Sequence, residues 1–280
     1  GLRYADTRRG KTHTKSGQGV MNILVCVKQV LDSGASVRIE EKSGQVMAEG
    51  SYWMNHADEF AVEEALVIKD RRHGTVADVI TVGPDRAARV LERAVGMGAD
   101  TGVHVRVPDE DPLSPWQVAA WIGSYARDRG YDLILAGVMA EDDMQGQVGP
   151  LLAEYLRIPC ATSVVCERID GEGDSVYVER EMESGRRDCL ELDLPALLTV
   201  QTGMNQPRYP TLSNLMRAKA QKAKVIAGSA LPPVEARETV LGIHYPQKSR
   251  AGAFLKGGPR EKAVQLLEIL QQQGLMRGQR

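Results

Sequence analysis

Five continuous apolar runs, each bounded by turn residues, constrain the fold of this chain more than any other feature. Such runs are typical of strands that are buried on both faces of a parallel sheet. They cover residues 23–28, 76–83, 102–107, 132–138 and 161–166. Because they alternate with helical patterns, the sequence predicts an α/β fold with a doubly wound, mostly parallel sheet of the Rossmann-like, adenine-nucleotide-binding type.

The segments between these runs repeat their apolar residues at helical spacing. The expected helices cover residues 58–72, 85–98, 114–130 and 146–158. In the first of them the apolar residues form one stripe, Glu63 and Glu64 fall outside that stripe, and Asp58 is the expected N-terminal cap. In the third, Ser114 is the expected cap and Pro115 the first helical residue.

The pattern changes after residue 165. Residues 175–200 alternate with a period of two around the turn Glu-Ser-Gly-Arg, which predicts an antiparallel hairpin appended to the sheet. Residues 239–246 read as a further strand, and residues 260–274 as an amphipathic helix. The last seventy or so residues therefore look like an arm, which has too few apolar residues for a core of its own and needs a partner surface.

Charge and cysteine spacing exclude several classes of protein. The net charge is −2, which argues against a nucleic-acid binder, and the four cysteines form no CxxC pair, which argues against a disulfide scaffold or a zinc site. The histidines are isolated, and no HExxH or nucleophile-elbow motif occurs. No apolar stretch has the length of a membrane span. We therefore expect neither a metal centre, nor a hydrolytic enzyme, nor insertion into a membrane.

Residues 1–20 are polar and basic and show no apolar periodicity. We interpret them as a disordered leader or an upstream extension, with an organelle transit peptide as the alternative. The corresponding locations are the cytoplasm and, for a transit peptide, the mitochondrial matrix.

The loop in residues 136–156 is the best candidate for a nucleotide site, because it follows a predicted strand and precedes a predicted helix. A helix that starts near Gln147 offers free N–H groups to a phosphate, and Gly146 and Gly149 let the backbone come close to it. Asp142 and its acidic neighbours suit ribose hydroxyls. An ordinary strand–helix loop remains the alternative. Val27 and Lys28, Gly83, and Asn55 lie at or near the same predicted sheet edge.

Residues 205–224, NQPRYPTLSNLMRAKAQKAK, contain no residue typical of catalysis. Composition alone leaves three interpretations, namely a linker, a nucleic-acid-binding tail and a docking element for another protein. The two prolines, Pro207 and Pro210, stiffen the segment. Lysines in its second half fit a solvated face.

Several motifs, in one order along the chain, resemble those of electron transfer flavoprotein beta subunits. They are MNILVCVKQVLDSGASVRI, MNHADEFAVEEAL, VGPDRAARVLERAVGMGAD, the acidic loop ending in GQVGP, and LPALLTVQTGMNQPRYPTLSNLMRAKA. The resemblance runs from about Met21 to the end, and its Pro-Arg-Tyr-x-x-Leu segment is the most specific part. On these motifs the chain is identified as a member of that family.

The resemblance implies an electron carrier that works as a heterodimer with an alpha subunit, which holds most of the FAD. Electrons come from flavin dehydrogenases such as acyl-CoA dehydrogenases and pass to a quinone oxidoreductase or another acceptor. The beta subunit buries an AMP in the usual members and a second FAD in the electron-bifurcating ones. The implied domains are a nucleotide-binding domain at 21–204, a recognition loop and basic helix at 205–224, and an arm on the partner subunit at 225–280.

Matching motif positions assigns two groups of site residues. The implied nucleotide contacts are Val27, Lys28, Asn55, Gly83, Asp142, Gln145, Gly146, Gln147, Val148 and Gly149. The implied dehydrogenase-docking residues are Pro207, Arg208, Tyr209, Thr211, Leu212, Leu215 and Met216. Leu212 is the anchor of the second group.

The chain also departs from the family pattern. Ser33 stands where many members carry a tyrosine toward the flavin, and the acidic loop has the length but not the Asp-Gly-Asp-Thr core of bifurcating members. The missing core, together with a C-terminal KSRAGAFLKGG segment unlike that of bifurcating members, favours AMP over a second FAD, whereas Ser33 concerns only the contact with the flavin. The competing hypothesis from another class is a stand-alone nucleotide-binding or nucleotide-hydrolysing α/β protein, and the lack of a Walker lysine in a glycine-rich loop counts against it.

Overall fold

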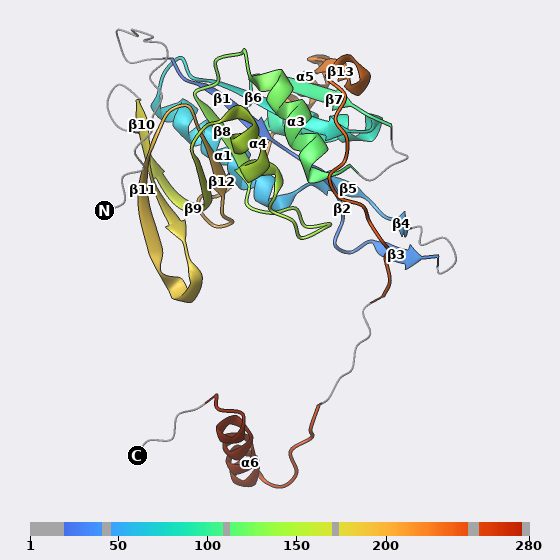
Figure 1. The fold of residues 1–280 in the computed structure, drawn as a ribbon, viewed down its shortest axis with the longest axis vertical. Helices are drawn as coiled ribbons and strands as arrows, with labels where there is room; N and C mark the ends of the chain where they lie inside the picture. The colour runs from blue at the N-terminus through green and yellow to red at the C-terminus, as the bar shows by residue number, and fades with distance from the viewer. Residues whose placement is uncertain (1–19, 41–45, 109–112, 170–173, 246–251, 276–280) are drawn as a thin grey trace. The chain divides into compact units, whose positions relative to one another are not determined.

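A nine-stranded sheet forms the centre of the computed structural model, which describes residues 20–40, 46–108, 113–169, 174–245 and 252–275 (Figure 1). The strand order is β11-β10-β9-β12-β8-β1-β6-β7-β13. The strands from β9 to β13 in this order run parallel, and β10 and β11 form an antiparallel hairpin at one edge. The predicted doubly wound α/β fold with an appended hairpin is confirmed.

Five parallel strands begin and end close to the predicted positions, whereas β12 and β13 were not predicted as parallel strands. The parallel strands are β1 (Asn22–Cys26), β6 (Val76–Gly83), β7 (Thr101–Arg106), β8 (Leu133–Gly137), β9 (Cys160–Arg168), β12 (Ala196–Val200) and β13 (Lys224–Ala227). The hairpin consists of β10 (Ser175–Glu181) and β11 (Arg187–Asp193). Two small sheets pair β2 (Gln29–Leu31) with β5 (Tyr52–Met54) and β3 (Ser36–Ile39) with β4 (Val46–Glu49).

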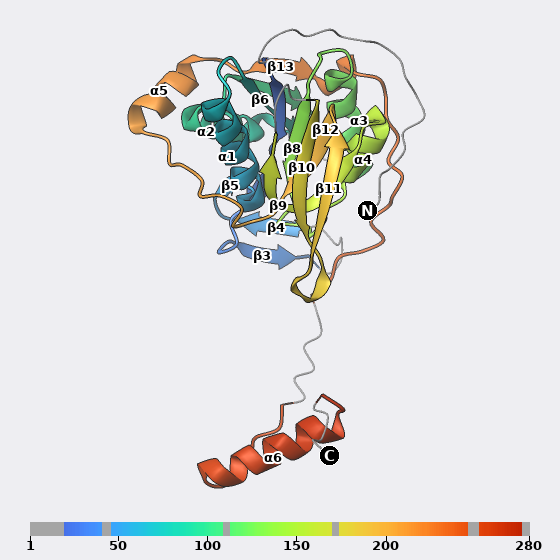
Figure 2. The same cartoon turned by 90° about the vertical axis from the view of Figure 1, so that its left-hand side faces the viewer.

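Helices cover both faces of the sheet (Figure 2). The helices α1 (His56–Arg71) and α2 (Ala88–Met97) lie on one face, and α3 (Pro115–Ala126) and α4 (Val148–Leu156) on the other. Successive strand residues point to opposite faces. Thus Ile23 and Val25 join the core under α1 and α2, while Leu24 joins the core under α3 and α4. Ser114 caps α3 through a capping box, as predicted.

Two further helices follow β12 in the chain. The helix α5 (Leu212–Ala220) packs on α2, with Ala218 buried and Leu215 close to Gly96. The helix α6 (Pro259–Gln272) belongs to a second compact unit, formed by residues 39–45 and 242–280. Residues 46–241 group with the first unit, and β13 adds a strand to its sheet. The predicted leader lies outside the described residues, apart from Val20.

Two assignments in the C-terminal half were wrong. The run Ala196–Val200 is not part of the hairpin but a fully buried strand between β9 and β8, parallel to both. Its continuous apolar sequence is typical of a strand buried on both faces. The prediction was wrong because it extended the period-two pattern of the hairpin to these residues, which do not alternate. The chain after β12 thus leaves from the middle of the sheet, not from its edge.

The second wrong assignment is the strand at residues 239–246, because residues 239–245 have no strand partner among the described residues and position 246 lies outside them. Leu241 is 98% exposed. Apolar residues that no neighbouring strand covers do not form a ladder, whatever their β-propensity.

The helix α1 is buried on more sides than its apolar stripe predicts. Glu63 and Glu64, placed outside the stripe, are only 5% and 4% exposed. The segment that follows β12 passes over this side of α1, and its residues Asn205 and Arg208 bond the two carboxylates. The expected exposure of Glu63 and Glu64 was wrong because a segment more than a hundred residues later in the sequence covers this part of the helix.

Candidate nucleotide site and docking segment

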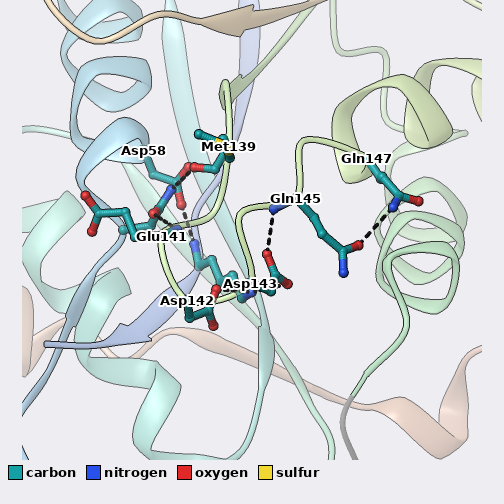
Figure 3. Close-up of polar contacts among 9 residues, drawn as sticks. Asp58, Met139, Glu141, Asp142, Asp143, Gln145 and Gln147 are labelled. Carbon is teal, nitrogen blue, oxygen red and sulfur yellow. Dashed lines mark hydrogen bonds and ion pairs between the residues drawn. The ribbon is translucent and has the colours of Figure 1, made fainter. Parts of the chain in front are cut away.

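The carboxyl ends of β1 and β8 meet at the point where the strand order reverses. From β1 the chain continues outward to β6 and β7 on one side, and it returns on the other side of β1 as β8. Ligands of doubly wound sheets bind in the crevice outside such a switch point. The loop after β8 lies at this position (Figure 3), and the predicted residues Lys28 and Asn55 bond it there.

Asp58 joins the ends of the two strands. Its carboxylate accepts hydrogen bonds from the backbone N–H of Lys28 at 2.7 Å and from the backbone N–H of Gly137 at 3.0 Å. Burial raises the pKa of Asp58 to about 7, while these two donors and the charge of Lys28 act in the opposite direction. Gly137 has no room for a side chain, because a Cβ atom there would lie 2.3 Å from Asp58 Oδ1. The sequence pattern predicted Asp58 as a helix cap, but the N-cap of α1 is Asn55. The bonds by which Asp58 joins the ends of β1 and β8 were not predicted.

Asn55 fixes the loop that follows β8. Its Nδ2 donates to the carbonyl oxygen of Met139 at 2.9 Å, and its Oδ1 accepts from the N–H of Glu141 at 3.1 Å. The side chain is almost completely buried. The oxygen and the nitrogen of the amide each bond the loop, and the side chain also hydrogen-bonds Asp58, so Asn55 fixes the loop against the amino end of α1.

Lys28 pairs with two carboxylates of the acidic part of the loop. Its Nζ lies 2.6 Å from Asp142 Oδ1 and 3.0 Å from Asp143 Oδ2. Asp143 also accepts from the N–H of Gln145, and the carbonyl of Gln145 accepts from the N–H of Ala140. The loop is thus a closed turn with one lysine against two carboxylates, and it lies over the ends of the strands (Figure 3).

The amino end of α4 faces the same loop. No side chain caps this helix, and Gln147 at the N-cap position donates its Nε2 to Gln145 Oε1 at 3.0 Å. Val148 and Gly149, the first two helical residues, keep backbone N–H groups that can bind a phosphate. Close packing is a further reason why glycine occupies these two positions. A Cβ on Gly146 would lie 2.7 Å from the Val138 carbonyl oxygen, and a Cβ on Gly149 would lie 2.6 Å from Thr199 Cγ2.

Val27 and Gly83 lie at the ends of β1 and β6 on this sheet edge. The N–H of Val27 donates to Ile80 at 2.9 Å, and the Gly83 carbonyl accepts from Val107 and binds His104 Nε2 at 2.9 Å. Their backbone groups are used within the sheet, so any ligand contact is through van der Waals surface. A separate, open cavity of about 1130 Å³ lies beyond them along β6, β7 and β13. The switch point lies away from it, between β1 and β8.

Residues 205–224, which we call the docking segment, expose a group of apolar side chains. Tyr209, Leu212 and Met216 are 88%, 76% and 66% exposed, and we call these three residues the docking surface. Thr211 is also exposed and caps α5 by accepting from the N–H of Asn214 at 3.2 Å. Solvent-facing apolar residues that gather on one short helix mark an interaction site.

Three residues of the predicted docking group are turned toward the protein instead. Pro207 and Arg208 are half-buried, and the Arg208 guanidinium bonds Glu63 and Asp70. A Cβ on Gly96 would lie 2.8 Å from Leu215 Cδ2, so Leu215 packs on α2. These residues hold the segment against α1 and α2. They do not contribute to the docking surface, which consists of Tyr209, Leu212 and Met216.

We predict that Asp58→Ala destabilises the protein and empties the nucleotide site. The substitution leaves the buried N–H groups of Lys28 and Gly137 without their acceptor, which costs about 2–4 kcal/mol in total. Urea denaturation and the nucleotide content of the purified protein measure the two effects. Glu59→Ala is the matched control, because Glu59 is the next acid of α1 and pairs with Arg93 instead of the strand ends. Wild-type nucleotide content in Asp58→Ala would contradict this function of Asp58.

Two further observations concern metal-binding side chains and membrane-spanning helices. Across the described ranges, no group of three or more His, Cys, Asp and Glu side chains has the arrangement of a metal site. No helix in the part of the chain that the structure describes is long and apolar enough to cross a membrane.

Comparisons with known proteins agree with this architecture. Residues 44–231 match the electron transfer flavoprotein domain. The chain is 34% identical over 256 residues to the electron transfer flavoprotein subunit beta of Bacillus subtilis, which covers 89% of this chain and 97% of the relative. It is 36% identical over 236 residues to the Sus scrofa subunit beta, covering 83% and 91%. It is also 36% identical to the mitochondrial subunit beta of Oryza sativa, covering 84% and 93%.

The match extends over most of the chain, and the residues matched by the family model include the acidic loop and the docking segment, in agreement with the resemblance that the motifs indicate. The chain therefore belongs to the family of electron transfer flavoprotein beta subunits.

Proposed function

We propose that this chain pairs with an alpha subunit, supports a flavin that lies mostly in that subunit, and holds an AMP of its own. Membership of a flavoprotein family supports the association with flavin and an alpha subunit, and it makes the chain an electron carrier and not an enzyme. The site between β1 and β8 is the observation that carries the AMP assignment.

The residues at the switch point fit an adenine nucleotide. The uncapped amino end of α4 offers N–H groups to one phosphate, and the carboxylates of Asp142 and Asp143 suit ribose hydroxyls. The same carboxylates disfavour additional phosphates next to them, because Lys28 offsets only part of their charge. A monophosphate is therefore favoured over the pyrophosphate of FAD. The bound nucleotide supplies rigidity to the loop and takes no part in electron transfer.

Electrons reach the alpha-subunit flavin, in this proposal, from flavin dehydrogenases such as acyl-CoA dehydrogenases, and they leave to a quinone oxidoreductase or another acceptor. The docking surface of Tyr209, Leu212 and Met216 supports this assignment, since a small apolar patch with a polar surround suits a weak and transient complex. The location stays a prediction, with the cytoplasm favoured and the mitochondrial matrix as the alternative.

The bound nucleotides test the proposal directly. We expect the co-expressed pair, denatured and analysed by chromatography and mass spectrometry, to release one FAD and one AMP per heterodimer. Two FAD and no AMP would instead identify an electron-bifurcating flavoprotein. A chain that purifies alone, without flavin, and hydrolyses ATP would support the stand-alone nucleotide-binding protein.

A further inference from the structure

The helix α1 carries two adjacent carboxylates that are buried. Glu63 and Glu64 each have one-twentieth or less of their surface exposed. A buried carboxylate is costly unless it is paired and hydrogen-bonded. The partners come from the start of the docking segment, so α1 and this segment depend on each other.

Arg208 binds Glu63 through several hydrogen bonds. Its Nε donates to Glu63 Oε2 at 2.9 Å, its Nη2 donates to Glu63 Oε1 at 2.9 Å, and its backbone N–H donates to Oε2 at 3.0 Å. The hydrogen bonds that Arg208 donates to Glu63 raise the pKa of Arg208, so the guanidinium stays charged. Two parallel bonds between a guanidinium and a carboxylate fix orientation as well as distance.

Asn205 provides a second attachment, three residues earlier. Its Nδ2 donates to Glu64 Oε2 at 2.7 Å and to the carbonyl oxygen of Phe60 at 3.0 Å. The chain is therefore tied to α1 at two points immediately before Tyr209. The helix α5 begins at Leu212, and its Leu215 rests on Gly96 of α2.

We infer that Glu63 is a positioning residue for dehydrogenase docking, although it does not belong to the docking surface. By binding Arg208, Glu63 fixes the backbone on α1 four residues before α5 begins. In this way it sets the position of Leu212, the first residue of α5. A surface that is ordered before binding loses less entropy in the complex. The inference rests on the proposed docking function and adds to it a residue on a different element.

Glu63→Gln tests the inference in the full-length heterodimer. Glutamine keeps the shape of glutamate, but it has one acceptor oxygen and no charge, so it cannot hold the guanidinium at two points. With an acyl-CoA dehydrogenase and its acyl-CoA substrate as the electron donor, we expect KM for the heterodimer to rise about fivefold. We expect kcat and flavin content to stay at wild-type values. Asp70→Asn is the control, because Asp70 is the exposed second partner of Arg208, and it should change KM less than about twofold.

A double-mutant cycle separates positioning from a general loss of stability. If Glu63 acts through Leu212, Glu63→Gln should raise KM in the wild-type background and leave it unchanged in the Leu212→Ala background. The inference would be overturned if Glu63→Gln raised KM by the same factor in both backgrounds, or if Glu63→Gln alone left KM unchanged. If Leu212→Ala itself leaves KM unchanged, the docking function fails instead.

Arg208→Lys gives the same test from the other partner, should Glu63→Gln not fold. Lysine keeps the positive charge but cannot form the two parallel bonds. We expect the same rise in KM and the same dependence on Leu212. A rise that persists in the Leu212→Ala background would count against positioning here too.

Discussion

Leu212→Ala should raise the KM of an acyl-CoA dehydrogenase for the heterodimer about thirtyfold, which corresponds to about 2 kcal/mol of binding free energy. Leu212 is the first residue of α5 and stays largely exposed, so its side chain is free to enter a pocket on a partner. Removing three side-chain carbons takes away the apolar area that this contact would bury. Steady-state kinetics at several heterodimer concentrations measure the change.

The matched control is Val225→Ala, which shortens an exposed aliphatic side chain on β13 of the same compact unit. It should leave KM unchanged, and neither variant should change flavin content or melting temperature. An unchanged KM in Leu212→Ala would show that dehydrogenases dock elsewhere. A loss of flavin in that variant would show that α5 contributes to holding the heterodimer together.

The parallel core could be predicted because its signal lies within each strand. The strand β6 occupies residues 76–83, as predicted, and the helices α1 and α4 begin within two residues of their predicted starts. Strands buried on both faces must be apolar throughout, and this requirement does not depend on which strand lies beside which. The three-residue strands β2 and β5 were missed, because so few residues show no period.

The failures share a physical cause, which is that distant segments decide what a residue faces. Glu63 and Glu64 have the spacing of solvent-facing residues, but the chain after β12 lies against them and bonds both carboxylates. Asp58 has the position of a helix cap, and only the return of β8 beside β1 brings the Gly137 N–H to it. Nothing within a short stretch of sequence distinguishes these cases from ordinary caps and surface acids.

The positions taken from the family motifs were brought together at the switch point, but the functions of individual residues differ from the expectation. Lys28 and the acidic loop lie at the predicted edge of the sheet, whereas Asn55 uses its amide to hold the loop and Asp58. Motif matching reports which residues belong to a site. The hydrogen bonds within the protein determine which of these residues still have polar atoms that can bind a ligand.

Removing residues 242–280 should abolish formation of the heterodimer. The helix α6 has no buried residue within its compact unit, and Val264, Leu266 and Leu267 all remain exposed. An isolated helix of 14 residues is marginal in water, so this one needs a surface that covers its apolar side. We expect chain 1–241 to fail to retain a tagged alpha subunit that full-length chain retains at equal stoichiometry.

Point variants separate the apolar contact of α6 from the mere length of the arm. Leu267→Asp places a charge among the apolar residues of α6 and should weaken retention of the alpha subunit at least about tenfold, because burial of an unpaired carboxylate costs several kcal/mol. Lys262→Asp, on the exposed first turn of the same helix, should retain it. Chain 1–241 should melt at the temperature of isolated full-length chain, because the hydrophobic core consists of residues before position 242. Retention of the alpha subunit by chain 1–241 would place the subunit interface on the first compact unit, and α6 would then need a different partner.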